Sequence, residues 1–317
     1  MHHIVYLDTD TIPAHISIPH PNFPHTWQSY GKTQPHEVVE RLKNATIVIT
    51  NKVVLDAAIL AQLPQLQLIA VSATGTNNID IDDCRQRGIP VCNIRGYATR
   101  SVPEHVIGMM FTLRRNLMGY HHDIEQGEWL KQNTFCFFTH PIGDIEGATI
   151  GIVGSGSLGN AVAQRAAALG MNVLFAEHKG RTTCRQGYTP FNNVLARADV
   201  ISLHCPLNAQ TEHLIGHAEI SCMKNTAILI NTGRGGLLDE QAVVDALKSG
   251  ELGGAGIDVF VNEPADNKNP LIAHASLPNL LLTPHVAWGS DSAIQTLVNQ
   301  LIDNLNQFVA GHPQHLL

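Results

Sequence analysis

The chain contains two consecutive series of elements, in which short apolar runs alternate with segments of helical spacing. In the first series, runs rich in β-branched residues predict strands at 3–7, 46–50, 68–71 and 89–92. Segments with helical spacing lie between them, at 36–43, 54–62 and 80–86. Such alternation of strands and helices is typical of a parallel sheet. The proline-rich stretch from Pro13 to Pro35 interrupts the series and predicts an irregular loop.

A long helical pattern follows, from about Val102 to about Gly127. Its apolar residues share one face: Val106, Met109, Met110, Leu113 and Leu117. The next stretch, Gly127 to Gly147, is expected to be a loop, although it contains Trp129, Phe135, Phe137 and Phe138. These aromatic side chains would form an apolar patch if exposed. They either contact a second copy of the chain or pack back on their own chain.

The second series begins with the expected strand Thr149–Val153 and the helix Ser157–Leu169, which Gly170 should end. Further strands are expected at 171–176, 200–203, 227–230, 256–259 and 280–282. A last helical pattern at 290–309 could cross back to the first series. The chain is therefore expected to be one doubly wound α/β unit inserted into another.

A glycine-rich turn joins the first strand of the second series to its helix: Gly154-Ser155-Gly156-Ser157-Leu158-Gly159. In this pattern the first glycine permits the tight turn and the second lets the backbone approach a pyrophosphate. The third lets helix and strand pack closely, and the helix N-terminus offers free N–H groups and a positive dipole. Strand, turn and helix together predict a dinucleotide site.

The next strand leads to Glu177, 18 residues past Gly159. A carboxylate there can bond the adenosine ribose hydroxyls and would repel the 2′-phosphate of NADP, so the sequence favours NAD. His178, Lys179 and Arg181 follow at once. They are either solvated loop charges or groups that attract that phosphate.

Composition and charge argue against several classes of protein. The chain has 317 residues, 44% of them hydrophobic, and its net charge of −7 gives no basic surface for nucleic acid. No apolar run reaches membrane-spanning length and no signal peptide is visible, so we expect a cytoplasmic protein. The six cysteines form no CxxC pair and no zinc-like cluster with the 18 histidines, so no metal site is expected.

Three later residues carry acid–base chemistry. Arg234, just past an expected strand, can clamp a carboxylate with its planar fork of donors and polarise the adjacent carbonyl. His285 can deliver a proton near neutral pH. Glu263 would bond the other ring nitrogen of His285, fix its tautomer and support its charged form. Alone, each could be a surface ion pair, a structural histidine or a turn residue; after a dinucleotide turn they predict hydride transfer to a 2-keto acid.

With these motifs in this order, the chain resembles the D-isomer-specific 2-hydroxyacid dehydrogenases over essentially its full length. The resemblance also rests on Gly75–Asp80, Glu104-His105, Arg114-Arg115-Asn116 and His204-Cys205-Pro206-Leu207. Ala73–Asn78, Glu177–Arg181 and Trp288 look most like glycerate dehydrogenases, also called hydroxypyruvate reductases. Pro103 departs from the family pattern, which commonly has a small residue there, but a first-turn proline is tolerated.

The resemblance implies roles for further residues. Thr74 and Gly75 would hold the substrate carboxylate, and Trp288 would either close the substrate side or fill the space between domains. Besides the glycine-rich turn and Glu177, the implied cofactor contacts are His204, Cys205, Pro206, Thr211, Asn231, Thr232, Gly233 and Asp258. Asp258 would bond the nicotinamide amide, and Asn231, Thr232 and Gly233 would line the nicotinamide. Cys205 and Pro206 would form the apolar edge of the adenine pocket, or Cys205 would serve only as a packing residue.

The resemblance thus implies two Rossmann-like domains: a substrate domain of 1–100 and 287–317, and an NAD-binding domain of 101–286. We expect an NAD-dependent dehydrogenase for a small acid such as hydroxypyruvate, glyoxylate or glycerate. Two alternatives stay open: a dinucleotide-sensing regulatory protein on the same scaffold, and a family dehydrogenase for formate, lactate or phosphoglycerate. The aromatic-containing segment from Tyr120 to Gly147, with the helix from Val102, predicts a homodimer.

Overall fold

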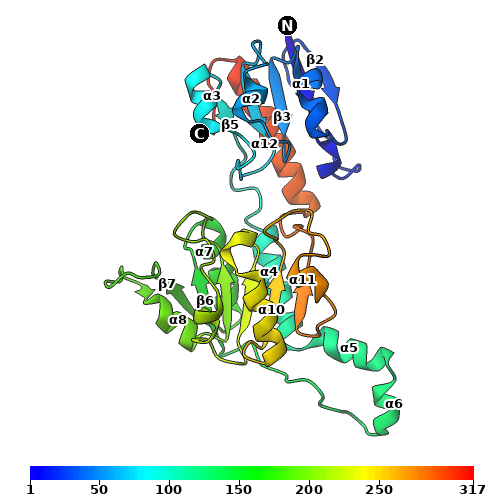
Figure 1. Cartoon of the computed structure of the whole chain (residues 1–317), viewed down its shortest axis with the longest axis vertical. Coiled ribbons are helices and arrows are strands. Elements are labelled where there is room, and N and C mark those ends of the chain that lie inside the picture. Colours follow the sequence, from blue (N-terminus) through cyan, green and yellow to red (C-terminus); the bar gives the residue numbers. More distant parts are fainter. The chain divides into compact units, whose positions relative to one another are not determined.

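The computed structural model describes residues 1–317, and the chain divides into two compact units (Figure 1). Unit 1 comprises Met1–Tyr97 and Gly289–Leu317, and unit 2 comprises Ala98–Trp288. Each unit contains one parallel sheet with helices between its strands. The expected α/β fold, with one doubly wound unit inserted into the chain of another, is confirmed.

The sheet of unit 1 has five parallel strands in the order β2-β1-β3-β4-β5. The strands are β1 His2–Tyr6, β2 His25–Ser29, β3 Ile47–Thr50, β4 Leu68–Val71 and β5 Val91–Cys92. The helices are α1 Val38–Leu42, α2 Ala57–Leu60, α3 Ile81–Arg87 and α12 Asp291–Val309, with 3-10 turns at Thr9–Thr11 and Pro35–Glu37. Asn304 of α12 donates to the backbone oxygen of Asn93, which ties this last helix to the end of β5.

The strand β2 lies in the stretch for which the sequence predicted only an irregular loop, so that prediction was wrong. Its sequence, His-Thr-Trp-Gln-Ser, is largely polar because β2 is an edge strand that pairs with β1 alone. A short polar edge strand lacks the apolar run on which strand predictions depend.

The sheet of unit 2 has seven parallel strands in the order β12-β11-β10-β9-β6-β7-β8. The strands are β6 Thr149–Val153, β7 Asn172–Ala176, β8 Tyr188–Thr189, β9 Val200–Leu203, β10 Ile228–Asn231, β11 Gly254–Ile257 and β12 Leu280–Leu282. The chain starts at β6, runs outward to β8 and returns to β9 on the other side of β6. The strand order therefore reverses between β6 and β9, and ligands of such sheets bind at the carboxyl ends of these strands.

The helices of unit 2 connect these strands and include one projecting pair. They are α4 Ser101–Arg114, α5 Leu117–Glu125, α6 Glu128–Gln132, α7 Ser157–Ala168, α8 Phe191–Arg197, α9 His217–Ile220, α10 Glu240–Ser249 and α11 Pro270–Ala273, with a 3-10 turn at Gly235–Leu237. Figure 1 shows α5 and α6 extending away from the sheet of unit 2.

The single long helix expected from Val102 to Gly127 is broken, so this prediction was wrong in detail. The break lies at Asn116, whose φ of 49° is left-handed. Asparagine tolerates this conformation better than most residues, and its side chain here donates to the backbone oxygen of Pro141. The helix α6 also lies within the stretch that was expected to be a loop.

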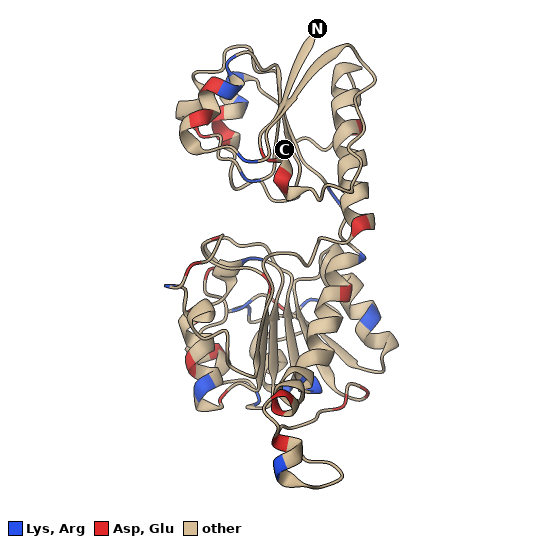
Figure 2. Cartoon of the chain, turned by 90° about the vertical axis from the view of Figure 1, so that its right-hand side faces the viewer, with Lys and Arg blue, Asp and Glu red and all other residues tan.

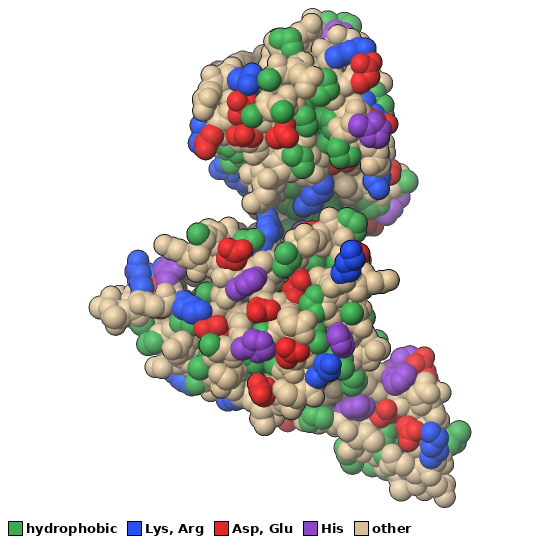
Figure 3. All heavy atoms as spheres, in the orientation of Figure 1, with side chains coloured by type: hydrophobic (Ala, Val, Ile, Leu, Met, Phe, Trp, Pro, Cys, Tyr) green, Lys and Arg blue, Asp and Glu red, His purple; other side chains and the backbone are tan.

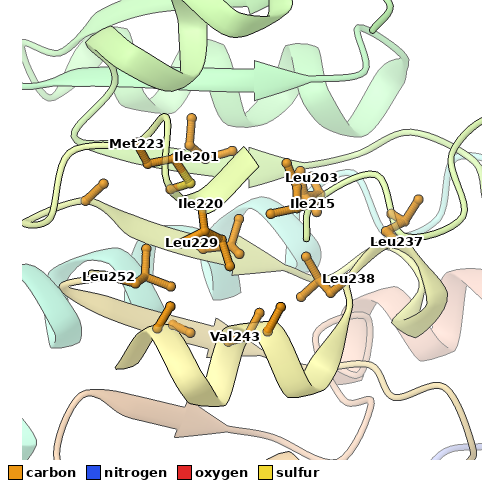
Figure 4. Close-up of a cluster of buried hydrophobic side chains, with 14 of the residues drawn as sticks. Ile201, Leu203, Ile215, Ile220, Met223, Leu229, Leu237, Leu238, Val243 and Leu252 are labelled. Carbon is orange, nitrogen blue, oxygen red and sulfur yellow. The ribbon is translucent and has the colours of Figure 1, made fainter. Parts of the chain in front are cut away.

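Buried apolar side chains form the core of unit 2 (Figure 4). Leu229 of β10, Ile201 of β9 and Val243 of α10 belong to one buried cluster. No strand in either sheet contains Asp, Glu, Lys or Arg; these residues lie on helices and loops (Figure 2). Because both faces of a parallel sheet are covered, charged groups that do chemistry must lie beyond the strand ends.

The glycine-rich turn allows a stability test with a matched control. A Cβ on Gly159 would lie 1.9 Å from the carbonyl oxygen of Gly154, whereas a Cβ on Gly156 would meet nothing within 4 Å. We expect Gly159→Ala to lower the free energy of unfolding by about 1–3 kcal/mol through overpacking. We expect Gly156→Ala to change it by less than about 1 kcal/mol. Urea unfolding followed by circular dichroism measures both, and equal midpoints would contradict the steric argument.

Candidate active site

The chemically active side chains of unit 2 follow the ends of adjacent strands. Arg234 follows β10, Glu263 follows β11 and His285 follows β12. These three strands are neighbours and parallel, so their carboxyl ends lie along one edge of the sheet. The 3-10 turn after Arg234 touches the loop after β11, because a Cβ on Gly235 would lie 2.0 Å from the backbone of Phe260. The fold therefore brings the three predicted residues to one region.

His285 and Glu263 form a direct pair. The Nδ1 atom of His285 lies 2.7 Å from Oε2 of Glu263. The other carboxylate oxygen of Glu263 accepts from the backbone N–H of Phe260 at 3.0 Å. An ionised carboxylate only accepts, so Nδ1 is the donor and Nε2 is left for another group. Both side chains are partly exposed, as proton exchange with a substrate requires.

The backbone at His285 is left-handed, with a φ of 55°. Asp258 holds it there. The backbone oxygen of Asp258 accepts from the N–H of His285 at 2.7 Å. Its buried carboxylate accepts from the N–H groups of Val286 and Ala287 and from the Thr283 hydroxyl. In this structure the Asp258 carboxylate therefore positions the segment that carries His285; its implied contact with the nicotinamide amide stays a prediction.

Arg234 extends from a strand end that Asn231 stabilises. The buried side chain of Asn231 donates to the backbone oxygen of Arg234 at 2.8 Å and accepts from the N–H of Gly233 at 3.0 Å. The guanidinium Nη1 donates to the backbone oxygen of Gly233 at 2.7 Å. Its remaining donors make no hydrogen bond within the chain, so they can bind an anion.

The glycine-rich turn fits a dinucleotide. Gly154 has a φ of 101°, and a Cβ there would lie 2.6 Å from the backbone of His204, at the end of β9. Gly156 is the N-cap of α7, no side chain caps this helix, and a Cβ on Gly156 would point into open space. The hydroxyl of Thr232, past β10, is buried and has no hydrogen-bond partner. The turn thus leaves backbone donors and room for phosphates at the helix N-terminus.

The Glu177 carboxylate lies at the end of β7 and is fully buried. Arg185, in the loop that follows, binds it through Nε and Nη2, both at 2.9 Å. This guanidinium is the main cause that lowers the pKa of Glu177 to about 2, so the carboxylate is ionised. The sequence identified Glu177 but not Arg185, because a basic residue in a polar loop carries no distinguishing signal.

Four predicted cofactor contacts, His204, Cys205, Pro206 and Thr211, follow β9. Burial lowers the pKa of His204 to about 4, and its Nε2 lies 2.9 Å from the Ser202 hydroxyl. Burial raises the pKa of the Cys205 thiol to about 11, so this thiol is neutral. The Thr211 hydroxyl donates to the backbone oxygen of Pro206 at 2.7 Å and so closes the loop between them.

The remaining predicted residues lie in two places. Thr74 and Gly75 follow β4 in unit 1, where the Thr74 hydroxyl donates to the backbone oxygen of Ile94 at 2.7 Å. Trp288 ends unit 2, and its ring N–H donates to the backbone oxygen of His285 at 2.9 Å.

Glu240 is a buried carboxylate that the sequence did not single out. It accepts from the N–H of Val261 at 2.9 Å and from the side chain of Asn269 at 2.7 Å. Through Val261 it holds the loop on which Glu263 lies. Its place at the start of the amphipathic α10 made it look like an ordinary first-turn acid.

Two further kinds of site would be a metal-binding cluster and a membrane-spanning helix. No group of three or more His, Cys, Asp or Glu side chains is placed to hold a metal ion. None of the helices combines the length and apolar character that crossing a bilayer would require.

Comparison with known proteins identifies the family of the chain. Residues 107–287 match the family described as D-isomer specific 2-hydroxyacid dehydrogenase, NAD binding domain. The chain is 47% identical to a glycerate dehydrogenase of Methylorubrum extorquens over 315 residues, covering 99% of this chain and 98% of that protein. It is 34% identical to a hydroxypyruvate reductase of Blautia hydrogenotrophica over 290 residues, covering 90% and 88%.

A solved structure shares the fold over the whole length. The D-lactate dehydrogenase of Lactobacillus jensenii with NAD⁺ superposes with a TM-score of 0.77 at 25% identity, covering 99% of each chain. The family match and the full-length relatives agree, and NAD is the cofactor of the matched domain. The chain belongs to the D-isomer specific 2-hydroxyacid dehydrogenases.

Proposed function

We propose that the chain reduces a small 2-keto acid, hydroxypyruvate or glyoxylate, to the D-2-hydroxy acid with NADH, and catalyses the reverse reaction. The observation that carries this is the 2.7 Å pairing of His285 Nδ1 with Glu263, which leaves Nε2 as a proton donor at the sheet edge that also holds Arg234. The names of the relatives, glycerate dehydrogenase and hydroxypyruvate reductase, favour these substrates.

Each residue has one task in this proposal. NADH supplies the hydride for the carbonyl carbon. Nε2 of His285 delivers a proton to the carbonyl oxygen, and Glu263 supports the charge of the imidazolium before that transfer. Arg234 binds the substrate carboxylate and polarises the carbonyl through its free donors. Thr74 and Gly75 would add hydrogen bonds to the carboxylate, and Trp288 would close the substrate side.

The chain's own groups would hold the cofactor at the carboxyl ends of β6, β7, β9 and β10. Gly154–Gly159 and the start of α7 would bind the pyrophosphate. Glu177, His204, Cys205, Pro206 and Thr211 would surround the adenosine. The nicotinamide side would be lined by Asn231, Thr232, Gly233 and Asp258, with the unpaired Thr232 hydroxyl as one bond donor.

An NADH oxidation assay tests the proposal directly. The panel contains hydroxypyruvate, glyoxylate, pyruvate and 3-phosphohydroxypyruvate. Fastest turnover with hydroxypyruvate or glyoxylate supports it, and fastest turnover with either of the others assigns a different family substrate. NADH binding without reduction of any acid would instead favour a dinucleotide-sensing regulatory protein. The cytoplasmic location stays a prediction.

The acid–base role of His285 predicts a specific kinetic defect. We expect His285→Ala to lower kcat by on the order of 10²–10⁴-fold, because the general acid is lost. The dissociation constant of NADH, followed by fluorescence titration, should change little. His217→Ala serves as the control, since His217 is exposed on α9. Near-parental turnover of His285→Ala would remove this residue from the mechanism.

The role of Arg234 depends on its planar fork of donors. Arg234→Lys keeps the charge but loses the paired hydrogen bonds, so kcat/KM for hydroxypyruvate should fall by roughly 10- to 100-fold. Arg197→Lys, at the exposed end of α8, is the matched control. If both variants reduce hydroxypyruvate as the parent does, the carboxylate clamp is wrong.

We further propose that the chain is a homodimer that pairs through the projecting α5–α6 region, which runs from Leu117 to Phe138. The region's large apolar side chains are exposed: Leu130 by 87%, Phe135 by 93% and Phe138 by 78%. Phe137 packs against Tyr120 of the same region, with ring centroids 5.8 Å apart. Figure 3 shows hydrophobic side chains on the visible face of this region beside charged ones. Apolar exposure of this extent is typical of a contact surface.

Sedimentation velocity at micromolar concentration measures the assembly. The parent should sediment as a dimer, and the double variant Phe135→Asp with Phe138→Asp should shift toward monomer because it buries two charges in the contact. Val54→Asp, at an exposed apolar position of unit 1, is the control. A parent that is monomeric while turning over would refute the dimer and leave the catalytic proposal untouched.

A further inference from the structure

The carboxylate of Glu177 has no capacity left for a ribose hydroxyl. Its Oε1 accepts from the N–H of His178 at 2.8 Å and from Nη2 of Arg185 at 2.9 Å. Its Oε2 accepts from the backbone N–H and from Nε of Arg185, both at 2.9 Å. A carboxylate offers about four lone-pair sites, and these four bonds occupy them. Glu177 can bond a ribose only if Arg185 moves away.

Arg185 is also connected to the phosphate-binding turn. Its guanidinium carbon lies 3.8 Å from the centroid of the Tyr188 ring. The Tyr188 hydroxyl bonds the hydroxyl of Ser155 at 2.5 Å, inside the glycine-rich turn. The strands β6 and β7, after which Ser155 and Glu177 lie, are direct neighbours. Arg185 therefore lies in the part of the site where the adenosine ribose of a dinucleotide is held.

Arg185 changes the net charge around Glu177. The Glu177–Arg185 pair is electrically neutral, and the Arg185 side chain keeps 43% of its surface exposed. Its Nη1 group makes no hydrogen bond within the chain. Lys179, in the same loop, forms an ion pair with Glu219, with Nζ 2.8 Å from Oε1. A ribose phosphate would thus meet an available guanidinium and no uncompensated carboxylate.

We propose that Arg185 determines cofactor specificity in this chain: by covering Glu177 it admits the 2′-phosphate of NADPH, so the site accepts NADPH as well as NADH. The proposal rests on the proposed dinucleotide site and changes the expectation that Glu177 excludes the phosphate. The remaining donors of Arg185 pair with the phosphate oxygens, as guanidinium groups commonly do. Without Arg185, the ionised Glu177 repels the same phosphate.

Binding of two cofactor fragments tests this without any turnover. ADP-ribose and 2′-phospho-ADP-ribose lack the nicotinamide and differ only in the phosphate, and calorimetry gives a dissociation constant for each. The parent should bind them within about tenfold of each other. Arg185→Gln should weaken the binding of 2′-phospho-ADP-ribose by at least about tenfold relative to that of ADP-ribose. The reason is that the carboxylate of Glu177 then has no cationic partner and repels the phosphate. Retained ADP-ribose binding shows that the variant is folded.

Two further variants identify the residue responsible. Arg185→Lys keeps the charge but not the paired bonds and should fall between parent and Arg185→Gln. Arg181→Gln removes the same charge from the same loop and should leave the ratio unchanged, since Arg181 contacts neither Glu177 nor Tyr188.

Three results would overturn the proposal: a parent that binds the phosphorylated fragment more than about tenfold more weakly, an unchanged ratio in Arg185→Gln, or a shift caused by Arg181→Gln instead. If neither fragment binds the parent, the dinucleotide site itself is wrong. If both bind but no keto acid is reduced, only the proposed reaction fails.

Discussion

The geometry around His285 depends on the hydrogen bonds that the buried carboxylate of Asp258 accepts. It accepts from the backbone of Val286 and Ala287 and from the Thr283 hydroxyl, so it fixes both sides of His285. The left-handed backbone of His285 costs free energy, and these bonds compensate for that cost. Glu263 orients the imidazole ring of His285 through the hydrogen bond to Nδ1. The backbone N–H of Phe260 in turn donates to the Glu263 carboxylate. The imidazole of His285 is thus oriented by the protein itself.

Two further constraints bring the site residues together. Parallel strands end at one edge, so Arg234, Glu263 and His285 converge although long segments of sequence separate them. Close backbone contacts then bring the loops together, because Gly154 lies against His204 and Gly235 lies against Phe260, where no Cβ would fit. These glycines serve the site by allowing neighbouring strand ends to approach each other.

Much of this could be predicted from sequence because it depends on local patterns. Apolar runs gave the buried strands, and the spacing of Gly154, Gly156 and Gly159 gave the turn. What failed lacks such a pattern. The edge strand β2 is polar, and the helix break at Asn116 depends on a left-handed residue and a bond to Pro141. Arg185 and Glu240 act through contacts with Glu177 and Val261 that only the folded chain brings about.

The two glutamate carboxylates of the candidate site differ in burial and in the basic side chain that each one binds. Glu263 is partly exposed and binds an imidazole, a partner that can give up its proton. Glu177 is fully buried and binds a guanidinium, which remains charged at every relevant pH. The first pair can therefore change its charge during a reaction, whereas the second has a constant charge and can only select what binds. The proposed proton transfer and the proposed cofactor selection are thus assigned to different carboxylates, because the partners of the two carboxylates differ in acidity.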